Sequence, residues 1–178
     1  LMKKYFFLIL TTILFFHNIS YCQEGLDRGF KVKVGDLSPE FSLELLDGSI
    51  LNNKNLLDKV VVLQFTASWC GVCVKEMPHL EEKVWQVFKS DDFILIGIDL
   101  KEELDVVRNF VSKVGVTYPV AIDKDGSVFE SFTTEKAGVT RNIVLNKRGE
   151  IIFLTRLFDE LEFSQMVEIV KAELLKYE

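Results

Sequence analysis

Residues 60–73 read VVVLQFTASWCGVC, and this stretch decides the fold. Its first six residues form an almost unbroken apolar, β-branched run, which is typical of a strand buried on both faces of a sheet. From Cys70 to Phe88, apolar residues recur every three or four positions, so a helix begins at the cysteines. The sequence therefore predicts a buried strand that leads into a helix whose first turn holds Cys70 and Cys73.

This placement predicts redox chemistry at the cysteine pair. The free backbone N–H groups and the positive end of the helix dipole favour a thiolate at Cys70. Cys73 is close enough to exchange with the same sulfur, and its position farther into the helix shields it, as suits a resolving thiol. We expect a redox-active Cys70–Cys73 disulfide in which Cys70 is the nucleophile.

Two structural roles for the cysteine pair, a stabilising disulfide and a zinc site, fit the sequence less well than redox chemistry. A bridge between cysteines this close in sequence constrains very little of the unfolded chain, so it is a poor structural staple. A zinc site needs two further N or S ligands, and His79 is the one histidine beyond the N-terminal segment. We therefore predict no metal.

The rest of the chain alternates strands with helices. A strand, a helix and a strand in succession imply a parallel crossover, and the short turn at residues 147–149 implies antiparallel neighbours. The expected strands are Glu40–Leu45, Phe93–Leu100, Tyr118–Ile122, Asn142–Asn146 and Glu150–Thr155, and the expected helices are Glu102–Val114, Val128–Phe132 and Glu160–Tyr177.

Residues 65–73, with Pro78 in the following helix, resemble the active-site passage of thioredoxin-like proteins. The segment Gly35–Phe41, the Asp47-Gly48 turn, Glu76-Met77-Pro78 and the inserted crossover resemble the TlpA/ResA-like group of exported redoxins. The resemblance covers about residues 33–175 and implies an α/β thioredoxin-like fold. In that fold a central mixed β-sheet is flanked by helices and carries an N-terminal strand extension and an inserted β-α crossover.

The same resemblance implies a function: exchange with disulfides of exported proteins. We expect reduction of these disulfides, with oxidation as the alternative, because the sequence does not fix the direction of electron flow. The resemblance also implies a membrane thiol carrier as electron donor, and no cofactor. Trp69, Gly71 and Val72 would border the substrate groove, although a core aromatic remains the alternative for Trp69. Gln64 stands where thioredoxins hold a buried acid, so Glu76 is the candidate proton acceptor for Cys73, with a solvated surface glutamate as the alternative. We interpret His79 as a surface or packing residue.

One position departs from the family pattern. Thioredoxin folds place a cis-proline opposite the cysteines, whereas this chain has Thr140 there, preceded by Val139. A cis bond before a residue other than proline costs ~2.5–4 kcal/mol, so we expect a trans Val139–Thr140 bond. Val139 and Thr140 would then form a groove of altered shape and substrate preference.

The N-terminal segment has the pattern of an export signal. Lys3 and Lys4 precede an apolar run of about a dozen residues, too short for a membrane span of ~20. We assign residues 1–22 to a signal peptide, 23–32 to a leader and 33–178 to the domain, and expect no transmembrane segment in the mature chain. A lipoprotein acylated at Cys22 is the alternative to cleavage after it.

Charge and composition narrow the partners. Removal of residues 1–22 takes two of the 21 basic and none of the 27 acidic residues, which leaves a net charge of −8 and makes nucleic acid an unsuitable partner. Two other functions remain as alternatives. A peroxiredoxin-like peroxidase would need a Thr three residues before the reactive Cys, where this chain has Ala67. A non-enzymatic binding domain would have no need of a second thiol at this spacing.

Overall fold

The computed structural model describes residues 28–90 and 92–176. The expected signal peptide, Cys22 and residues 23–27 of the leader lie outside this part. The strands are β1 (Ser42–Leu45), β2 (Ile50–Asn52), β3 (Val60–Thr66), β4 (Phe93–Leu100), β5 (Val120–Asp123), β6 (Arg141–Leu145) and β7 (Ile151–Arg156). The helices are η1 (Asn53–Leu56), α1 (Gly71–Leu80), η2 (Glu81–Trp85), α2 (Gln86–Phe88), α3 (Leu104–Val114), α4 (Ser127–Phe132) and α5 (Glu160–Leu175).

The strands form one mixed sheet in the order β2-β1-β5-β4-β3-β6-β7. The neighbours β3, β4 and β5 are parallel, which confirms the expected crossover through α3. The neighbours β6 and β7 are antiparallel, as their short connection predicts. The expected N-terminal extension is the hairpin of β1 and β2, which pairs with the outer edge of β5. The thioredoxin-like α/β fold is thus confirmed.

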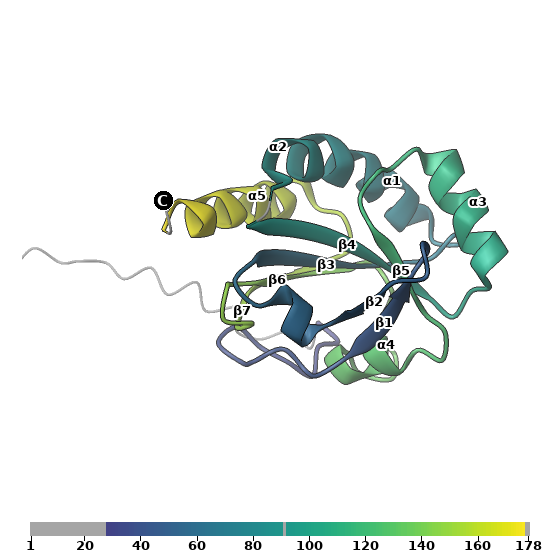
Figure 1. Ribbon diagram of the computed structural model, residues 1–178, viewed down its shortest axis with the longest axis horizontal. Coiled ribbons are helices and arrows are strands. Elements are labelled where there is room, and N and C mark those ends of the chain that lie inside the picture. The colour runs from purple at the N-terminus through teal and green to yellow at the C-terminus, as the bar shows by residue number, and fades with distance from the viewer. Residues whose placement is uncertain (1–27, 91, 177–178) are drawn as a thin grey trace, which may run out of the picture.

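Helices cover both faces of the sheet (Figure 1), and each face has its own apolar core. α1, α3 and α5 pack on one face, while α4 packs on the other. All seven residues of β3 are buried between the two cores, because neither face of this central strand meets water. The strand therefore gives its carboxyl end, and the cysteines that follow it, a rigid support.

Residues 28–32, which the sequence analysis assigned to the leader, pack against the domain. Phe30 forms a β-bridge with Thr133, and the Lys31 amide donates to the Phe132 carbonyl over 2.9 Å. Arg28 pairs with Glu162 of α5 at 2.6 Å. This part of the leader is therefore built into the fold.

The structure adds local detail that the sequence pattern did not predict. The long helix expected over residues 70–88 is present, but its middle turn, η2, has the wider π geometry. The short pieces β2 and η1 follow the Asp47-Gly48 turn. β2 and η1 span only three and four residues, which is too short for the spacing of apolar residues to distinguish a helix from a strand.

Candidate active site

Cys70 and Cys73 form a disulfide at the carboxyl end of β3, as expected. Cys70 is the N-cap of α1, and its sulfur accepts the Cys73 N–H over 3.2 Å. Cys70 is half-buried, whereas Cys73 is fully buried. The backbone donor and the helix dipole both stabilise negative charge on the Cys70 sulfur, which is the sulfur that a partner can reach.

Thr140 lies against the disulfide. Its Oγ1 is 3.1 Å from the sulfur of Cys70 and 3.1 Å from the sulfur of Cys73, and its side chain is buried. The described residues contain no cis peptide bond, so the Val139–Thr140 bond is trans, as predicted. Sequence reasoning placed Thr140 opposite the cysteines but did not predict that its hydroxyl contacts both sulfurs.

Glu76 is buried on the sheet side of α1, which rules out the solvated alternative. Its Oε1 accepts from Asn142 Nδ2 over 2.7 Å, and its Oε2 accepts from Gln64 Nε2 over 3.4 Å. Burial raises the pKa of Glu76 to about 7, against the opposing effect of these two hydrogen bonds. A carboxyl group with this pKa both holds and releases a proton at neutral pH.

Glu76 belongs to a buried polar chain that crosses the sheet. Tyr118 donates its hydroxyl to Gln64 Oε1 over 2.8 Å, and at the other end Asn142 Nδ2 donates to Thr155 Oγ1 over 2.8 Å. Burial raises the pKa of Tyr118 well above its usual value, so its hydroxyl stays protonated and donates. The sequence analysis missed Tyr118, Asn142 and Thr155. The sequence did contain a signal for this chain. Gln64 is a polar residue within the apolar run of residues 60–65, and a buried polar side chain needs a hydrogen-bond partner.

The outer side of the redox pair is open. Trp69 is 67% exposed, which rules out the core alternative, and Gly71 is exposed beside it. Val72 is half-buried, while the side chain of Val139 packs into the core. The structure thus brings Trp69, Gly71 and Val72 to the surface around Cys70, and places Val139 and Thr140 beneath them.

The loop before Cys70 is tied to the start of α3. The Ser68 N–H donates to Glu102 Oε2 and the Ser68 hydroxyl to Glu102 Oε1, both over 2.6 Å. Asp99, at the end of β4, is fully buried, and its pKa is raised to about 8 by burial and then by the charge of Glu102. The Glu102 carboxylate therefore holds the loop, whereas the Asp99 carboxyl group stays protonated at neutral pH.

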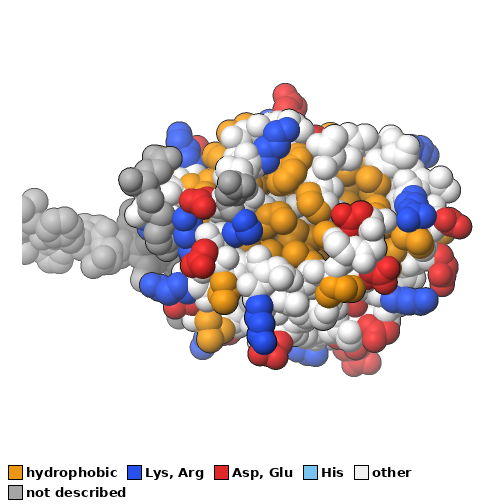
Figure 2. All heavy atoms as spheres, in the orientation of Figure 1, with side chains coloured by type: hydrophobic (Ala, Val, Ile, Leu, Met, Phe, Trp, Pro, Cys, Tyr) orange, Lys and Arg blue, Asp and Glu red, His pale blue; other side chains and the backbone are white. Residues whose placement is uncertain are grey.

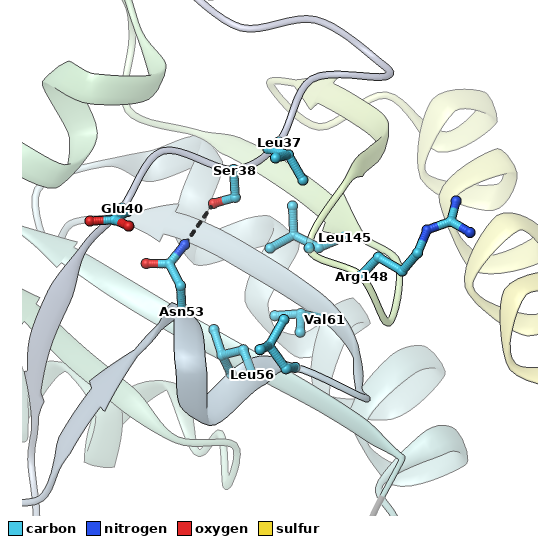
Figure 3. Close-up of a pocket in the computed structure, with 10 residues that line it drawn as sticks. Leu37, Ser38, Glu40, Asn53, Leu56, Val61, Leu145 and Arg148 are labelled. Carbon is cyan, nitrogen blue, oxygen red and sulfur yellow. Dashed lines mark hydrogen bonds between the residues drawn. The ribbon is translucent and has the colours of Figure 1, made fainter.

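Two of the hollows in the described part of the chain lie near opposite ends of the sheet. One of about 620 Å³ lies beside the redox site between α1 and α3, where Ser68, Val74, Pro78 and Phe110 are among its lining residues. The other, of about 160 Å³, lies near the start of β3 and is lined by Leu37, Leu56 and Leu145 among others (Figure 3). The second hollow contains none of the predicted site residues.

The described residues include no group of three or more His, Cys, Asp or Glu side chains that could hold a metal. His79 is half-buried and stacks on Phe158 with ring centroids 4.9 Å apart, so of the two expected roles it has the packing one. Within residues 28–90 and 92–176, no helix is both long and apolar enough to cross a membrane.

Comparisons with known proteins agree with this site. Residues 33–170 match the Redoxin family. The thiol-disulfide oxidoreductase ResA of Halalkalibacterium halodurans is 30% identical over 142 residues, which cover 79% of each chain. The solution structure of a candidate protein disulfide isomerase from Bacteroides thetaiotaomicron is 44% identical, with a TM-score of 0.79 over 82% of this chain and 92% of that chain.

The fold alone extends to more distant structures. The crystal structure of a candidate thiol:disulfide interchange protein DsbE from Chlorobium tepidum is 20% identical, with a TM-score of 0.69 over 80% of this chain and 99% of that chain. The family match, the ResA relatives and the Cys70–Cys73 pair all indicate the same family and the same type of reaction. This chain belongs to the redoxin family, as a TlpA/ResA-like thiol–disulfide oxidoreductase.

Proposed function

We propose that this oxidoreductase acts outside the cytoplasm and reduces disulfides of exported proteins through Cys70, Cys73 and Glu76. The observation that carries the proposal is the paired geometry of the cysteines. The sulfur of Cys70 sits at a helix N-cap where a partner can reach it, and Cys73 is buried one turn farther along α1. The basic and then apolar segment of residues 1–22 supports export.

The reaction starts from the reduced enzyme. The Cys70 thiolate attacks one sulfur of the substrate disulfide, so a mixed disulfide forms and the other substrate sulfur leaves as a thiolate. Glu76 accepts the Cys73 proton, and the Cys73 thiolate attacks the Cys70 sulfur and displaces the second substrate thiolate. Two electrons pass from the enzyme sulfurs to the substrate disulfide. One of the two protons that the substrate thiols take up comes from Cys73 by way of Glu76, and the other comes from water.

The same site indicates the kind of substrate and the kind of electron donor. Trp69, Gly71 and Val72 offer a surface against which an extended polypeptide around the substrate disulfide packs. Regeneration of the thiols needs two electrons from another dithiol, and we propose a membrane thiol carrier as that donor. Ala67, where a peroxidase would hold a Thr, is buried and has no hydroxyl, which disfavours peroxide as substrate.

Trapping tests the division of roles between the cysteines. A reduced Cys73→Ser variant should form stable mixed disulfides with proteins of the exported fraction, because the resolving thiol is missing. A Cys70→Ser variant should trap none. If both variants trap equally well, the assignment is wrong.

The direction of electron flow is tested separately, by equilibration of the Cys70–Cys73 pair with glutathione buffers. A potential near ~−270 mV, typical of thioredoxin, supports reduction, whereas one near ~−120 mV, typical of DsbA, indicates oxidation. Intact-mass analysis of the protein from its own cells tests export, because cleavage after Cys22 and acylation of Cys22 give different masses.

A further inference from the structure

The hydroxyl of Thr140 contacts both sulfurs of the redox pair. Its Oγ1 lies 3.1 Å from each of the two sulfurs, so a single hydroxyl is within hydrogen-bond distance of both atoms that exchange electrons. Proline, which this position carries in thioredoxin folds, has no side-chain donor. The contact is therefore a feature of this chain.

The surrounding backbone holds Thr140 in place. The Leu157 N–H donates to the Thr140 carbonyl over 3.0 Å. Arg141 Nε donates to the Gly138 carbonyl over 3.0 Å and so closes the turn that contains Val139 and Thr140. A β-branched side chain on a fixed backbone has few rotamers, so the hydroxyl is held against the sulfurs before any substrate arrives.

Charge moves between the two sulfurs during exchange. Cys70 carries the thiolate before attack, and Cys73 carries it once the mixed disulfide has formed. A hydroxyl has one proton to donate, and a hydrogen bond to a charged acceptor is about twice as strong as one between neutral groups. Rotation about the Cβ–Oγ1 bond of Thr140 redirects that proton without moving the side chain.

We propose that Thr140 is a catalytic residue that donates its hydroxyl hydrogen bond to whichever of Cys70 and Cys73 carries the negative charge. This deepens the proposed function and rests on its order of thiolate attack. The hydroxyl stabilises the reduced form more than the disulfide, because a thiolate accepts a stronger hydrogen bond than a disulfide sulfur. Thr140 thus makes Cys70 more reactive at neutral pH and raises the reduction potential of the pair.

Two substitutions isolate the hydroxyl. Thr140→Val keeps the shape and removes the donor, whereas Thr140→Ser keeps the donor. For Thr140→Val we expect Cys70 of the reduced protein to react with iodoacetamide about tenfold more slowly at pH 6–7. The pH midpoint of that reaction should rise by about one unit. The same tenfold change in the equilibrium with glutathione makes the potential about 30 mV more negative. Thr140→Ser should stay close to wild type in all three measurements.

Controls separate this effect from a change in packing. Thr133 is also buried, and its hydroxyl donates to the Phe129 carbonyl over 2.7 Å, so Thr133→Val removes a matched hydroxyl that touches neither sulfur. It should leave the reaction midpoint and the potential unchanged. Thr140→Ala, which adds no bulk, replaces Thr140→Val if the valine variant does not fold.

The ionisable groups near the pair are the same in all these variants. On the elements that meet at the pair these groups include Lys75, Glu76 and His79 on α1, Arg141 on β6, Asp99 at the end of β4, and Glu102, which bonds to Ser68. Shifts in the midpoint therefore report the hydroxyl.

Three results would overturn the proposal: wild-type values in a folded hydroxyl-free variant, equal values for Thr140→Ser and Thr140→Val, or loss of the fold in both hydroxyl-free variants. The last result would assign Thr140 a structural role. Alkylation and glutathione equilibration need no protein substrate. They therefore decide the role of Thr140 even if the enzyme proves not to reduce exported proteins.

Discussion

At the scale of single residues, Glu76 connects burial to chemistry. Its carboxyl is buried about one helical turn after Cys73 on α1 and has a pKa raised to about 7. We expect Glu76→Gln to lower the rate of disulfide exchange at pH 7–8 by about tenfold or more, since general-base contributions are commonly ~10²–10⁴-fold. The inflection near pH 7 in the pH–rate profile should also disappear. Stopped-flow measurement of insulin reduction across pH 5–9 checks both.

Glu82→Gln is the matched control, because Glu82 is exposed in the same helical segment. It should follow the wild-type profile throughout. A Glu76→Gln variant with the wild-type rate at every pH would return Glu76 to a purely structural role beside Asn142 and Gln64.

Thr140 also bears on substrate choice. Because the Val139–Thr140 bond is trans, the backbone that we propose to face a bound polypeptide differs from that of a cis-proline loop. We expect Thr140→Pro to change the order in which a panel of disulfide-containing proteins and peptides is reduced, by several-fold between best and worst. Initial rates on that panel measure the change, and an unaltered order would contradict the expectation.

At the scale of elements, a contact between the β4–α3 connection and the loop before α1 positions the redox site. Both oxygens of Glu102 bind Ser68, two residues before Cys70. Glu102→Ala should lower the free energy of unfolding by about 1–2 kcal/mol, since a carboxylate that accepts two hydrogen bonds is lost. It should also slow exchange, because Trp69 and Cys70 then move more freely.

Denaturant unfolding and Trp69 fluorescence measure this effect, the latter in a Trp85→Phe background that leaves a single tryptophan. Glu103→Ala is the control, because Glu103 is the exposed N-cap of α3 and makes no side-chain cap. Equal unfolding energies for the two variants would mean that the link to Ser68 does not stabilise the loop.

Among the elements, the sequence predicted those whose formation depends on a local pattern of residues. The apolar run of β3, the periodicity of α1 and the Cys spacing were sufficient for the fold and the redox pair. They were not sufficient for β2, η1 and η2, which span three to five residues each. The partners of Glu76 come from residues far along the chain, such as Asn142, and the contact of Thr140 with both sulfurs depends on the path of a loop. Such contacts have no signal in local sequence spacing.

At the scale of the whole molecule, the order of strands in the sheet determines where the residues of the proposed site meet. The redox pair follows β3, Glu102 follows β4 and Thr140 precedes β6, so they meet at one end of three neighbouring strands. The opposite end holds the smaller hollow of Figure 3. Figure 2 shows hydrophobic side chains in the middle of one face with Lys, Arg, Asp and Glu around them. The residues of the proposed redox site thus lie together at one end of the sheet.

The global stability should depend on pH through the buried acids. In the folded state the pKa of Asp99 is raised from 3.8 to about 8 and that of Glu76 from 4.5 to about 7. Between those values the folded protein keeps protons that the unfolded chain releases, so stability falls as pH rises. Each group contributes at most about 1.4 kcal/mol per pH unit within its window.

Asp99→Asn tests this dependence, because asparagine keeps the shape of the protonated acid and cannot ionise. For the oxidised protein, we expect the variant to gain stability over wild type progressively from pH 4 to pH 8 and no further above it, as measured by urea unfolding at each pH. Asp105→Asn, at an exposed position at the start of α3, should run parallel to wild type. If the difference between Asp99→Asn and wild type is the same at pH 4 and pH 8, Asp99 ionises in the folded protein at an ordinary pH. The burial of its carboxyl would then cost no stability.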